Sequence, residues 1–388
     1  MTVLTYELLM QRLSNIEPLI RGAAESAEAR RHLDSAVASA MAQAGLYRIA
    51  VPRSLGGAEA HPREQILLIE AVSRIHGSSG WNLMIGIENM GMLGAVYDRA
   101  VTERLYADPR LIISGSLNPL GKALREDGGY RISGQWPFVS GIHNAGYFWS
   151  QSIVQDAQGP VRDDRGVVLC ETMVPTDRVE ILDTWEVSGL RGSGSHDVVI
   201  RDLFVPDEFV SQVQRQKPVE AGVLYRLPIY SRLAYNKVGV ATGIARAAIE
   251  QFVELACEKR PRGSAALLRN RTDAQRAVAE AERIVGSARS YVFETVDALW
   301  RTVEKGDPVT AKQKALLQLA CSGAASEAIR AVEMLYAAAG ASVNFTASPL
   351  GRSLRDVLVV RQHIMVSSQF TEAAGRVLLG MDSDSFLF

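Results

Sequence analysis

The sequence predicts an α+β protein of three successive domains, because the spacing of its apolar residues changes twice along the chain. Apolar residues recur at helical intervals up to residue 110, form short runs between glycines up to residue 215, and then return to helical intervals. Of the 388 residues, 47% are hydrophobic, which is enough to bury more than one core. We therefore expect an N-terminal helical domain over 1–110, a β domain over 111–215 and a helical bundle over 216–388.

The N-terminal domain is predicted from two series of apolar residues that share helix faces. Leu33, Val37 and Met41 are each four residues apart, and Ile66 and Ile69 open a second series. A segment rich in proline and glycine separates the two series and marks a loop. This domain is therefore expected to consist of helices joined by turns.

The middle domain is predicted to be a small antiparallel barrel or sandwich. Its apolar runs are short and rich in β-branched and aromatic residues, with glycine-containing turns between them. The expected strands are Leu111–Ser114, Gly129–Ser133, Tyr147–Val154, Val167–Val174 and Val198–Val205.

The C-terminal domain is predicted to be an antiparallel four-helix bundle, because four long helical patterns are joined by short connections. The expected helices are Ile229–Cys257, Thr272–Glu304, Thr310–Ala339 and Ser353–Leu379. His363 falls within the last of these patterns. No other side chain in the neighbouring sequence titrates around neutral pH, so His363 is a candidate for proton chemistry.

Composition excludes several classes of function. The net charge is −1 and the basic residues are scattered, so neither nucleic acid nor an anionic membrane is an expected partner. Cys170, Cys257 and Cys321 lie far apart, which predicts no metal site and a reducing, cytoplasmic location. The chain also lacks a P-loop, a Gly-x-Ser-x-Gly nucleophile motif and a dinucleotide-binding glycine fingerprint.

Three motifs in the predicted domain order carry a resemblance to a known family. They are AGLYR at residues 44–48, GYRISGQWPFVSG at residues 129–141 and GLRGSGSHDV at residues 189–198. In order and character they are similar to segments of the acyl-CoA dehydrogenase superfamily. The resemblance covers nearly the whole chain and implies that superfamily's fold, with N-terminal helices, a middle β domain and a C-terminal four-helix bundle.

The C-terminal motif separates two branches of that superfamily. Many acyl-CoA dehydrogenases carry a catalytic glutamate shortly after an Arg-Asp pair, whereas here Arg355 and Asp356 are followed by His363 and Ile364. This pattern resembles the oxygenase components of two-component flavin monooxygenases. The resemblance implies diffusible reduced FMN or FAD from a separate NAD(P)H:flavin reductase, O2 as co-substrate, a C4a-hydroperoxide, and a homotetramer. The expected reaction is hydroxylation or N- or S-oxidation of a small organic molecule.

The same resemblance implies roles for individual residues. His363 and Ser140 are the expected catalytic residues, with Ser140 bonded to the N5 region of the flavin. Trp136 and Phe138 alternate along their strand, so we expect them to share one face and to wall the flavin ring. The remaining cofactor-binding candidates are Ser116, Ser193, Ser195, Arg260 and Arg262, the two arginines reaching the flavin phosphate of a neighbouring subunit.

The expected substrate-binding residues lie on an N-terminal helix and are Met84, Glu88, Asn89 and Met92. Glu88 stands where several of the resembled oxygenases carry a histidine, so this chain departs from their pattern there. A carboxylate at this position suits either a base or a partner for a cationic substrate, and an ordinary salt bridge fits equally well.

Other interpretations stay open at this point. An acyl-CoA dehydrogenase or flavin oxidase fits if its base stands on another helix, and acyl-CoA would then bleach its bound FAD. A flavin-free scaffold that acts as a binding protein would bind no reduced flavin. Taken singly, His363 also fits a packed helix residue, residues 188–195 an ordinary glycine turn, and Arg260 and Arg262 a helix end.

Overall fold

The computed structural model describes residues 3–385, 387 and 388. Contacts within the chain cluster into two compact units. Unit 1 comprises the residues up to Ala60 together with Asn82–Val187 and Arg191–Tyr225, and unit 2 comprises His61–Trp81, Ser188–Leu190 and Arg226–Phe388. The two boundaries between the three domains expected from the sequence stay a prediction. Among the described helices, none is both long enough and apolar enough to cross a membrane.

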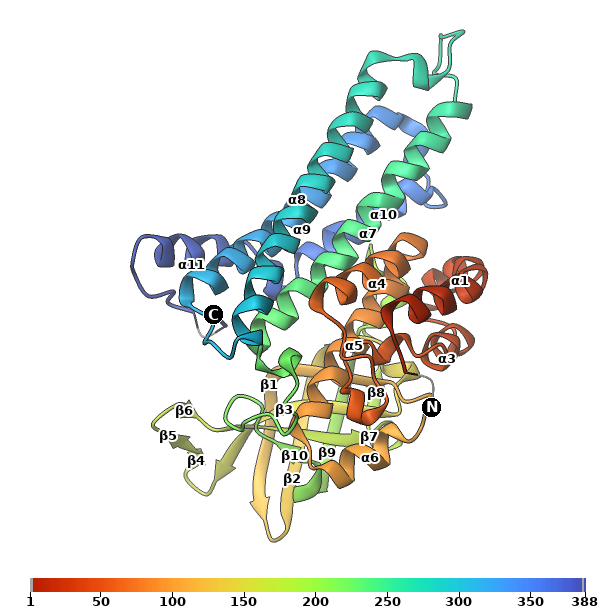
Figure 1. The fold of residues 1–388 in the computed structure, drawn as a ribbon. Coiled ribbons are helices and arrows are strands. Elements are labelled where there is room, and N and C mark those ends of the chain that lie inside the picture. Colours follow the sequence, from red (N-terminus) through yellow and green to blue (C-terminus); the bar gives the residue numbers. More distant parts are fainter. Residues whose placement is uncertain (1–2, 386) are drawn as a thin grey trace. The chain divides into compact units, whose positions relative to one another are not determined.

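Unit 1 combines helices with one large sheet (Figure 1). Its helices are α1 (Tyr6–Gly22), α2 (Ala24–Arg30), α3 (Ser35–Gln43), most of α5 (Gly77–Val96), and α6 (Arg99–Tyr106). The strands are β1 (Ile113–Glu126), β2 (Gly129–Val139), β3 (Tyr147–Asp156), β4 (Gly159–Pro160), β5 (Arg162–Asp163), β6 (Gly166–Val167), β7 (Leu169–Pro175), β8 (Glu180–Leu182), β9 (His196–Pro206) and β10 (Val210–Ser211). The expected strands thus correspond to β1, β2, β3, β7 and β9.

The sheet is mixed, and the expectation of a purely antiparallel domain is wrong at one pair. The strand order is β10-β7-β3-β1-β2-β9-β8, with β4 paired to β3, and β5 and β6 form a separate small ribbon. Strands β1 and β3 run parallel, whereas the other pairs are antiparallel. Strand propensity in the sequence does not determine strand direction, because direction depends on the path of the connections.

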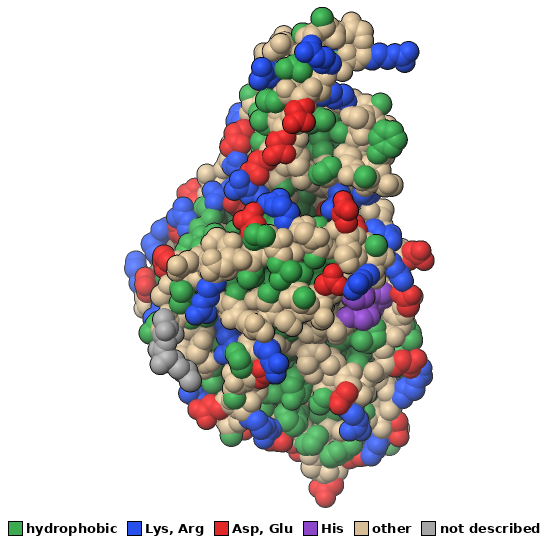
Figure 2. Space-filling view, turned by 90° about the vertical axis from the view of Figure 1, so that its right-hand side faces the viewer, with side chains coloured by type: hydrophobic (Ala, Val, Ile, Leu, Met, Phe, Trp, Pro, Cys, Tyr) green, Lys and Arg blue, Asp and Glu red, His purple; other side chains and the backbone are tan. Residues whose placement is uncertain are grey.

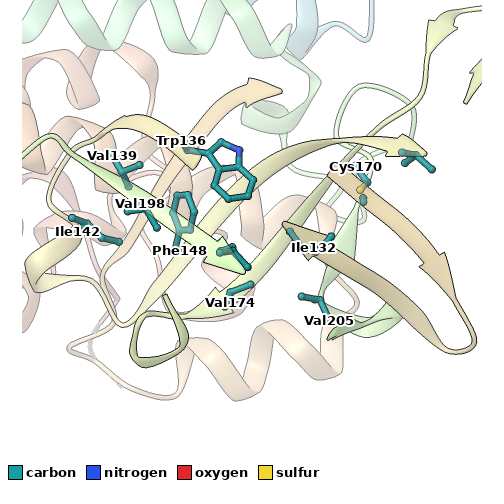
Figure 3. Close-up of a cluster of buried hydrophobic side chains, with 12 residues drawn as sticks. Ile132, Trp136, Val139, Ile142, Phe148, Cys170, Val174, Val198 and Val205 are labelled. Carbon is teal, nitrogen blue, oxygen red and sulfur yellow. The ribbon is translucent and has the colours of Figure 1, made fainter. Parts of the chain in front are cut away.

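The core of the sheet is an apolar cluster from β1, β2, β3, β7 and β9 (Figure 3). Trp136 and Phe148 meet edge to face there, with ring centroids 5.6 Å apart, and both are fully buried. The indole N–H of Trp136 donates to the carbonyl of Gln151 at 2.8 Å, so burial of the ring leaves its donor satisfied.

A bulge in β2 separates the two aromatic residues that were expected to share a face. The register between β2 and β9 shifts between Trp136 and Val139, and Phe138 has a left-handed φ of 62°. Phe138 is consequently 69% exposed, whereas Trp136 is 0% exposed. The alternation rule fails here because an extra residue in one strand turns the following side chains to the opposite face. The prediction of a shared face is therefore wrong.

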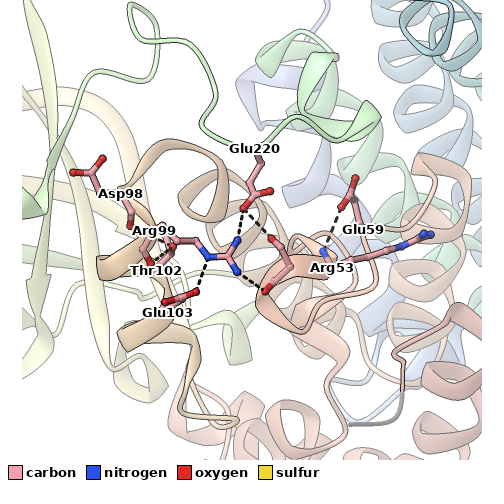
Figure 4. A network of polar contacts seen from close by, with 8 residues as sticks. Arg53, Glu59, Asp98, Arg99, Thr102, Glu103 and Glu220 are labelled. Atoms are coloured by element: carbon pink, nitrogen blue, oxygen red, sulfur yellow. Dashed lines mark hydrogen bonds and ion pairs between the residues drawn. The ribbon is translucent and has the colours of Figure 1, made fainter.

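Two polar networks in unit 1 hold the segment of residues 211–220. Near its end, Glu220 accepts from the Ser54 hydroxyl at 2.8 Å and lies 3.4 Å from Arg99, which also binds Glu103 at 2.7 Å (Figure 4). Further back, the Glu171 carboxylate is 1% exposed and accepts from Gln151, Ser211 and the amide of Val213. Burial raises the pKa of Glu171. These bonds order the segment between the sheet and the long helices.

Unit 2 is helical (Figure 1). Its helices are α4 (Pro62–Ile75), the start of α5, α7 (Ile229–Glu258), α8 (Thr272–Glu304), α9 (Ala311–Ala339), α10 (Pro349–Arg361) and α11 (Gln369–Leu378). Helices α4 and α7 approach closely at two glycines. A Cβ atom at Gly239 would lie 2.7 Å from the Ile66 carbonyl, and one at Gly243 would lie 2.5 Å from the Glu70 carbonyl.

The expected fourth helix, Ser353–Leu379, is broken in the middle, and the prediction of one continuous helix is wrong. Helix α10 ends at Arg361, a single turn η10 (Ile364–Val366) follows, and α11 begins at Gln369. His363 stands in the break with extended backbone, φ −66° and ψ 132°. Its Nδ1 accepts the amide hydrogen of Met365 at 3.2 Å. Such local side-chain bonds compete with helical ones, which helical periodicity cannot reveal.

Candidate active site

Three serine hydroxyls form a buried chain in unit 1. The Ser140 Oγ lies 2.7 Å from the Ser195 Oγ, which lies 2.7 Å from the Ser193 Oγ. All three residues are at most 4% exposed. Within the described part of the chain, Ser195 is the only hydrogen-bond partner of the Ser193 hydroxyl. Either hydroxyl of each pair can act as the donor, so the three side chains form one continuous hydrogen-bonded group.

Backbone contacts hold the ends of this chain of hydroxyls together. The amide of Gly141 donates to the Ser193 carbonyl at 2.9 Å, and the Ser114 hydroxyl donates to the Ser140 carbonyl at 2.8 Å. The Asn82 amide donates to the Ser193 carbonyl at 3.2 Å. Gly141 has a φ of +76°, and a Cβ there would lie 2.3 Å from the Asn82 Oδ1, so no other residue fits without rearrangement.

An exposed aromatic side chain lies two residues before Ser140. The Phe138 ring is packed edge to face against Trp185, with centroids 6.2 Å apart and planes at 88°. Trp185 itself is only 8% exposed. The bulge thus presents a broad apolar ring two residues from a buried hydroxyl. This combination suits a flat heteroaromatic ligand with polar atoms on one edge.

The other candidates in unit 1 lie on α5 and β1. Met84, Glu88, Asn89 and Met92 are all buried on α5. The Asn89 amide donates to the Ile113 carbonyl at 3.1 Å, which ties α5 to β1. Ser116 is half-buried on β1, and its hydroxyl accepts from the amide of Asn118 at 3.4 Å.

Two sequence motifs that lie far apart in the chain meet in unit 2. The Asp356 carboxylate is 2% exposed and accepts the amide hydrogen of Leu190 at 2.6 Å. The Arg355 guanidinium donates to the Ser188 carbonyl at 3.1 Å. A Cβ at Gly189 would lie 2.1 Å from the Arg355 carbonyl, so the close approach requires glycine. The Arg-Asp pair of α10 therefore fastens the tripeptide Ser188–Leu190.

His363 is half-buried in unit 2, where the Trp81 indole meets its ring at a centroid distance of 5.7 Å. Burial, together with the positive charge of Lys237, holds the pKa of His363 well below its ordinary value. Lys237 is itself only 1% exposed on α7. His363 is thus neutral at physiological pH. Because Nδ1 accepts from Met365, the proton of the neutral imidazole is on Nε2, which makes His363 a hydrogen-bond donor.

Arg260 and Arg262 are exposed in the connection between α7 and α8. Arg260 donates to the Ala265 carbonyl in the same connection. For Arg262 the described residues provide no hydrogen bond or ion pair. Both side chains are exposed, so each is accessible to a ligand.

A histidine cluster adjoins the serine loop in unit 1. His32 and His143 stack with ring centroids 4.5 Å apart, and His143 meets His196 edge to face at 4.8 Å. Histidine side chains gather in one patch on the face drawn in Figure 2. Burial and the two neighbouring histidines lower the pKa of His143 to about 4. Within the described residues, no group of three or more His, Cys, Asp or Glu side chains could hold a metal ion.

Sequence reasoning missed five residues that the structure brings to these groups. In unit 1 these are Asn82, Ser114 and Trp185, and in unit 2 they are Trp81 and Lys237. Two of them carry a signal in the sequence: Asn82 and Asn89 are seven residues apart on an apolar helix, and Lys237 interrupts an apolar run. Polar residues that recur on a buried helix face usually serve a bond or a ligand.

Comparisons with known proteins show the family of the chain. The chain matches the family models described as Acyl-CoA dehydrogenase, N-terminal domain, over residues 15–104 and Acyl-CoA dehydrogenase, C-terminal domain, over residues 236–368. It is 31% identical over 354 residues to the indole-3-acetate monooxygenase of Pseudomonas putida, covering 90% of this chain and 88% of that protein.

Two further relatives extend the comparison. The chain is 26% identical over 392 residues to the oxygenase component of an FADH2-dependent resorcinol hydroxylase from Rhizobium sp. (strain MTP-10005), covering 96% of this chain and 94% of that one. The 3-HSA hydroxylase from Rhodococcus sp. RHA1 has the same fold, with a TM-score of 0.88 at 24% identity over 98% of both chains. The chain therefore belongs to the acyl-CoA dehydrogenase family and, within it, to the oxygenase components of two-component flavin-dependent monooxygenases.

Proposed function

We propose that this protein hydroxylates a small aromatic compound, and that Phe138 and Ser140 hold the ring of the reduced flavin that it uses. The observation that carries the proposal is the exposed Phe138 ring, two residues before Ser140, together with the buried group of hydroxyls to which Ser140 belongs. A flavin fits this donor set, because its ring is flat and apolar on its faces while its N5 edge carries polar atoms. When bound, reduced flavin supplies the electrons that activate O2.

The protein's own contribution is to orient this ring and to keep water away from it. Phe138 provides an apolar face, and the Ser140 hydroxyl, which Ser195 holds at 2.7 Å, is proposed to lie at the N5 edge, where a hydroxyl can donate or accept. Ser116 is the further cofactor contact on β1. Trp136, which was expected to wall the flavin, is assigned to the core of the sheet instead. The substrate contacts are proposed on α5, at Met84, Glu88, Asn89 and Met92.

His363 is proposed to donate a hydrogen bond to the oxygen atom that is transferred. A neutral imidazole with its proton on Nε2 is a donor, and its depressed pKa argues against a role as the base that takes a substrate proton. The sequence left both roles open. The geometry of unit 2 supports the first of them.

The aromatic substrate class is supported by the relatives, whose names specify indole-3-acetate and resorcinol. The oxygenase component implies a separate flavin reductase as its partner. We propose either FMN or FAD as the flavin, a homotetramer as the active unit, and the cytoplasm as its location. The free thiols of Cys170, Cys257 and Cys321 support a reducing compartment.

Ser140→Ala should increase release of H2O2 by on the order of three- to tenfold, because loss of one hydrogen bond removes roughly 0.5–1.5 kcal/mol of stabilisation. The measurement is a single mixing of the protein with reduced FMN and O2, with indole-3-acetate as the substrate probe, followed by assay of H2O2 and hydroxylated product. Ser150→Ala is a matched control, since Ser150 is buried in the same sheet and pairs with Thr172 at 3.0 Å.

The result of this experiment can contradict the proposal in two ways. Equal H2O2 release from the Ser140 and Ser150 variants would contradict the proposed role of Ser140 in the flavin site. If the unaltered protein neither binds reduced FMN nor reduced FAD, the proposed function itself is wrong.

Replacing both Arg260 and Arg262 by Ala should weaken binding of reduced flavin, because each lost charge-assisted hydrogen bond to a phosphate costs roughly 1.5–3 kcal/mol. The measurement is an anaerobic titration with reduced FMN, with sedimentation velocity to establish the oligomeric state. Arg269→Ala, in the same exposed connection, is the control. A monomer with unchanged affinity would overturn both the tetramer and the arginine contact.

A further inference from the structure

His196 makes an unusual pair of bonds next to the serine chain. Its Nδ1 accepts the backbone amide hydrogens of both Thr184 and Trp185, each at 3.2 Å. The side chain is 2% exposed, and backbone groups of Arg31 and Leu182 also interact with its ring. Since Nδ1 accepts two N–H groups, the neutral ring carries its proton on Nε2.

Those bonds determine where Trp185 lies. Trp185 follows strand β8, and its backbone turns away from the sheet at that point. Beside the His196 bonds, the Thr184 hydroxyl exchanges bonds with the Asp197 amide at 2.9 Å and its carboxylate at 3.0 Å. His196 and Asp197, the first two residues of β9, therefore hold the backbone at Thr184 and Trp185. The Trp185 indole in turn packs against Phe138.

We propose that His196 and Trp185 are positioning residues for the flavin. His196 fastens the backbone of Trp185, and the Trp185 indole keeps the Phe138 ring in the orientation that receives the flavin. This inference rests on the proposed contact between Phe138 and the flavin. Phe138 needs such support because it is 69% exposed and has a left-handed backbone, so the strand alone restrains it little.

The protonation state of His196 gives this support a pH dependence. Burial lowers the pKa of His196, so the ring is neutral at neutral pH. As the pH falls through that value, Nδ1 gains a hydrogen and both amides lose their acceptor. Flavin affinity should therefore decrease on acidification. The titratable and charged groups around His196 are Asp183, whose Oδ1 lies 3.5 Å from Nδ1, then Arg31, His143, His32 and Asp197, with Glu186 acting on Arg31.

The test is an anaerobic titration of the intact protein with reduced FMN, together with the visible circular dichroism of bound oxidised FMN. His196→Phe keeps the ring but removes the acceptor, and should weaken binding by about tenfold and change the dichroism, in line with the loss of one or two buried hydrogen bonds. Trp185→Leu leaves the backbone bonds in place and should have a similar effect. His196→Asn retains an acceptor and should restore part of the affinity.

His143→Leu is the matched control, because it alters the histidine cluster but leaves both bonds to Nδ1 intact. It should bind reduced FMN like the unaltered protein. Because the pKa of His196 is lowered, the ring gains its proton below the ordinary histidine range, and there affinity should fall with pH in the unaltered protein and stay level in His196→Phe. If His196→Phe fails to fold, Trp185→Leu still decides the question.

Two outcomes separate this inference from the proposed function. If the unaltered protein binds reduced FMN and both His196→Phe and Trp185→Leu bind it equally well, the inference is overturned while the function stands. If the unaltered protein binds no reduced flavin, the proposed function fails first.

Discussion

His363→Leu should slow oxygen transfer by about 10²- to 10³-fold, the usual effect of removing one hydrogen-bond donor from a developing charge. The reason is that the neutral imidazole, with Nδ1 bonded to the Met365 amide, carries its hydrogen on Nε2 and can donate it, whereas leucine has no donor. The measurement is single-turnover hydroxylation of an aromatic substrate on which the unaltered protein is active, at saturating reduced flavin. Affinity for reduced flavin should change far less than the rate.

The pH profile adds an independent check. An unperturbed histidine would titrate within the range from about pH 6 to 9. The pKa of His363 is held well below its ordinary value, so the unaltered protein should show no titration of His363 within this range. Acidification below it adds a proton to Nδ1, breaks the bond to Met365, and should reduce the rate.

Gln362→Ala is the matched control for His363→Leu, because Gln362 is the exposed neighbour at the end of α10. It should retain the unaltered rate and the unaltered thermal unfolding. An unchanged rate in folded, flavin-binding His363→Leu would exclude His363 from the reaction. Attention would then move to Glu88, the buried carboxylate on α5.

Trp136→Ala should destabilise the protein by about 3–5 kcal/mol, the usual cost of removing a fully buried tryptophan. The indole packs against Phe148 and its N–H is bonded to Gln151, so the variant loses contacts and leaves a cavity. Phe138→Ala, two residues away, should alter stability by no more than about 0.5 kcal/mol because its ring is exposed. Urea unfolding followed by far-ultraviolet circular dichroism measures both.

The same two variants should have the opposite order of effects on flavin binding. Phe138→Ala should weaken reduced FMN by roughly two- to tenfold, as expected for loss of an aromatic contact of about 0.5–1.5 kcal/mol. At a temperature where it is folded, Trp136→Ala should bind with nearly unchanged affinity. If Trp136→Ala lost flavin affinity while Phe138→Ala kept it, the assignment of the two faces would be reversed.

Periodicity and motif order were sufficient to predict the class of the fold. The first helical pattern corresponds to α1–α6, the β pattern to the strands of unit 1, and the second helical pattern to α7–α11. This is because each element buries one face, and the spacing of its apolar residues follows that face. Ser140 was expected near the flavin N5 region, and Ser193 and Ser195 in a glycine-rich loop that binds the cofactor; the structure joins their hydroxyls, while their roles stay a prediction.

Other features depended on contacts between residues that are distant in the chain. The bulge after Trp136 reversed the face of Phe138, because strand alternation holds only while the register with β9 is kept. The break at His363 arose from a bond between its own side chain and the Met365 amide, and such a bond leaves the apolar period intact. Both departures lie at proposed functional residues.

The sequence alone therefore determined which residue types were available, and on which kind of element most of them would stand. It determined the family and the main β strands. Only the tertiary structure decided that Trp136 belongs to the core and Phe138 to the surface, that Asp356 binds the amide of Leu190, and that burial, together with the charge of Lys237, lowers the pKa of His363. The physical reason is that burial, hydrogen-bond partners and pKa depend on neighbours in space, which local spacing does not specify.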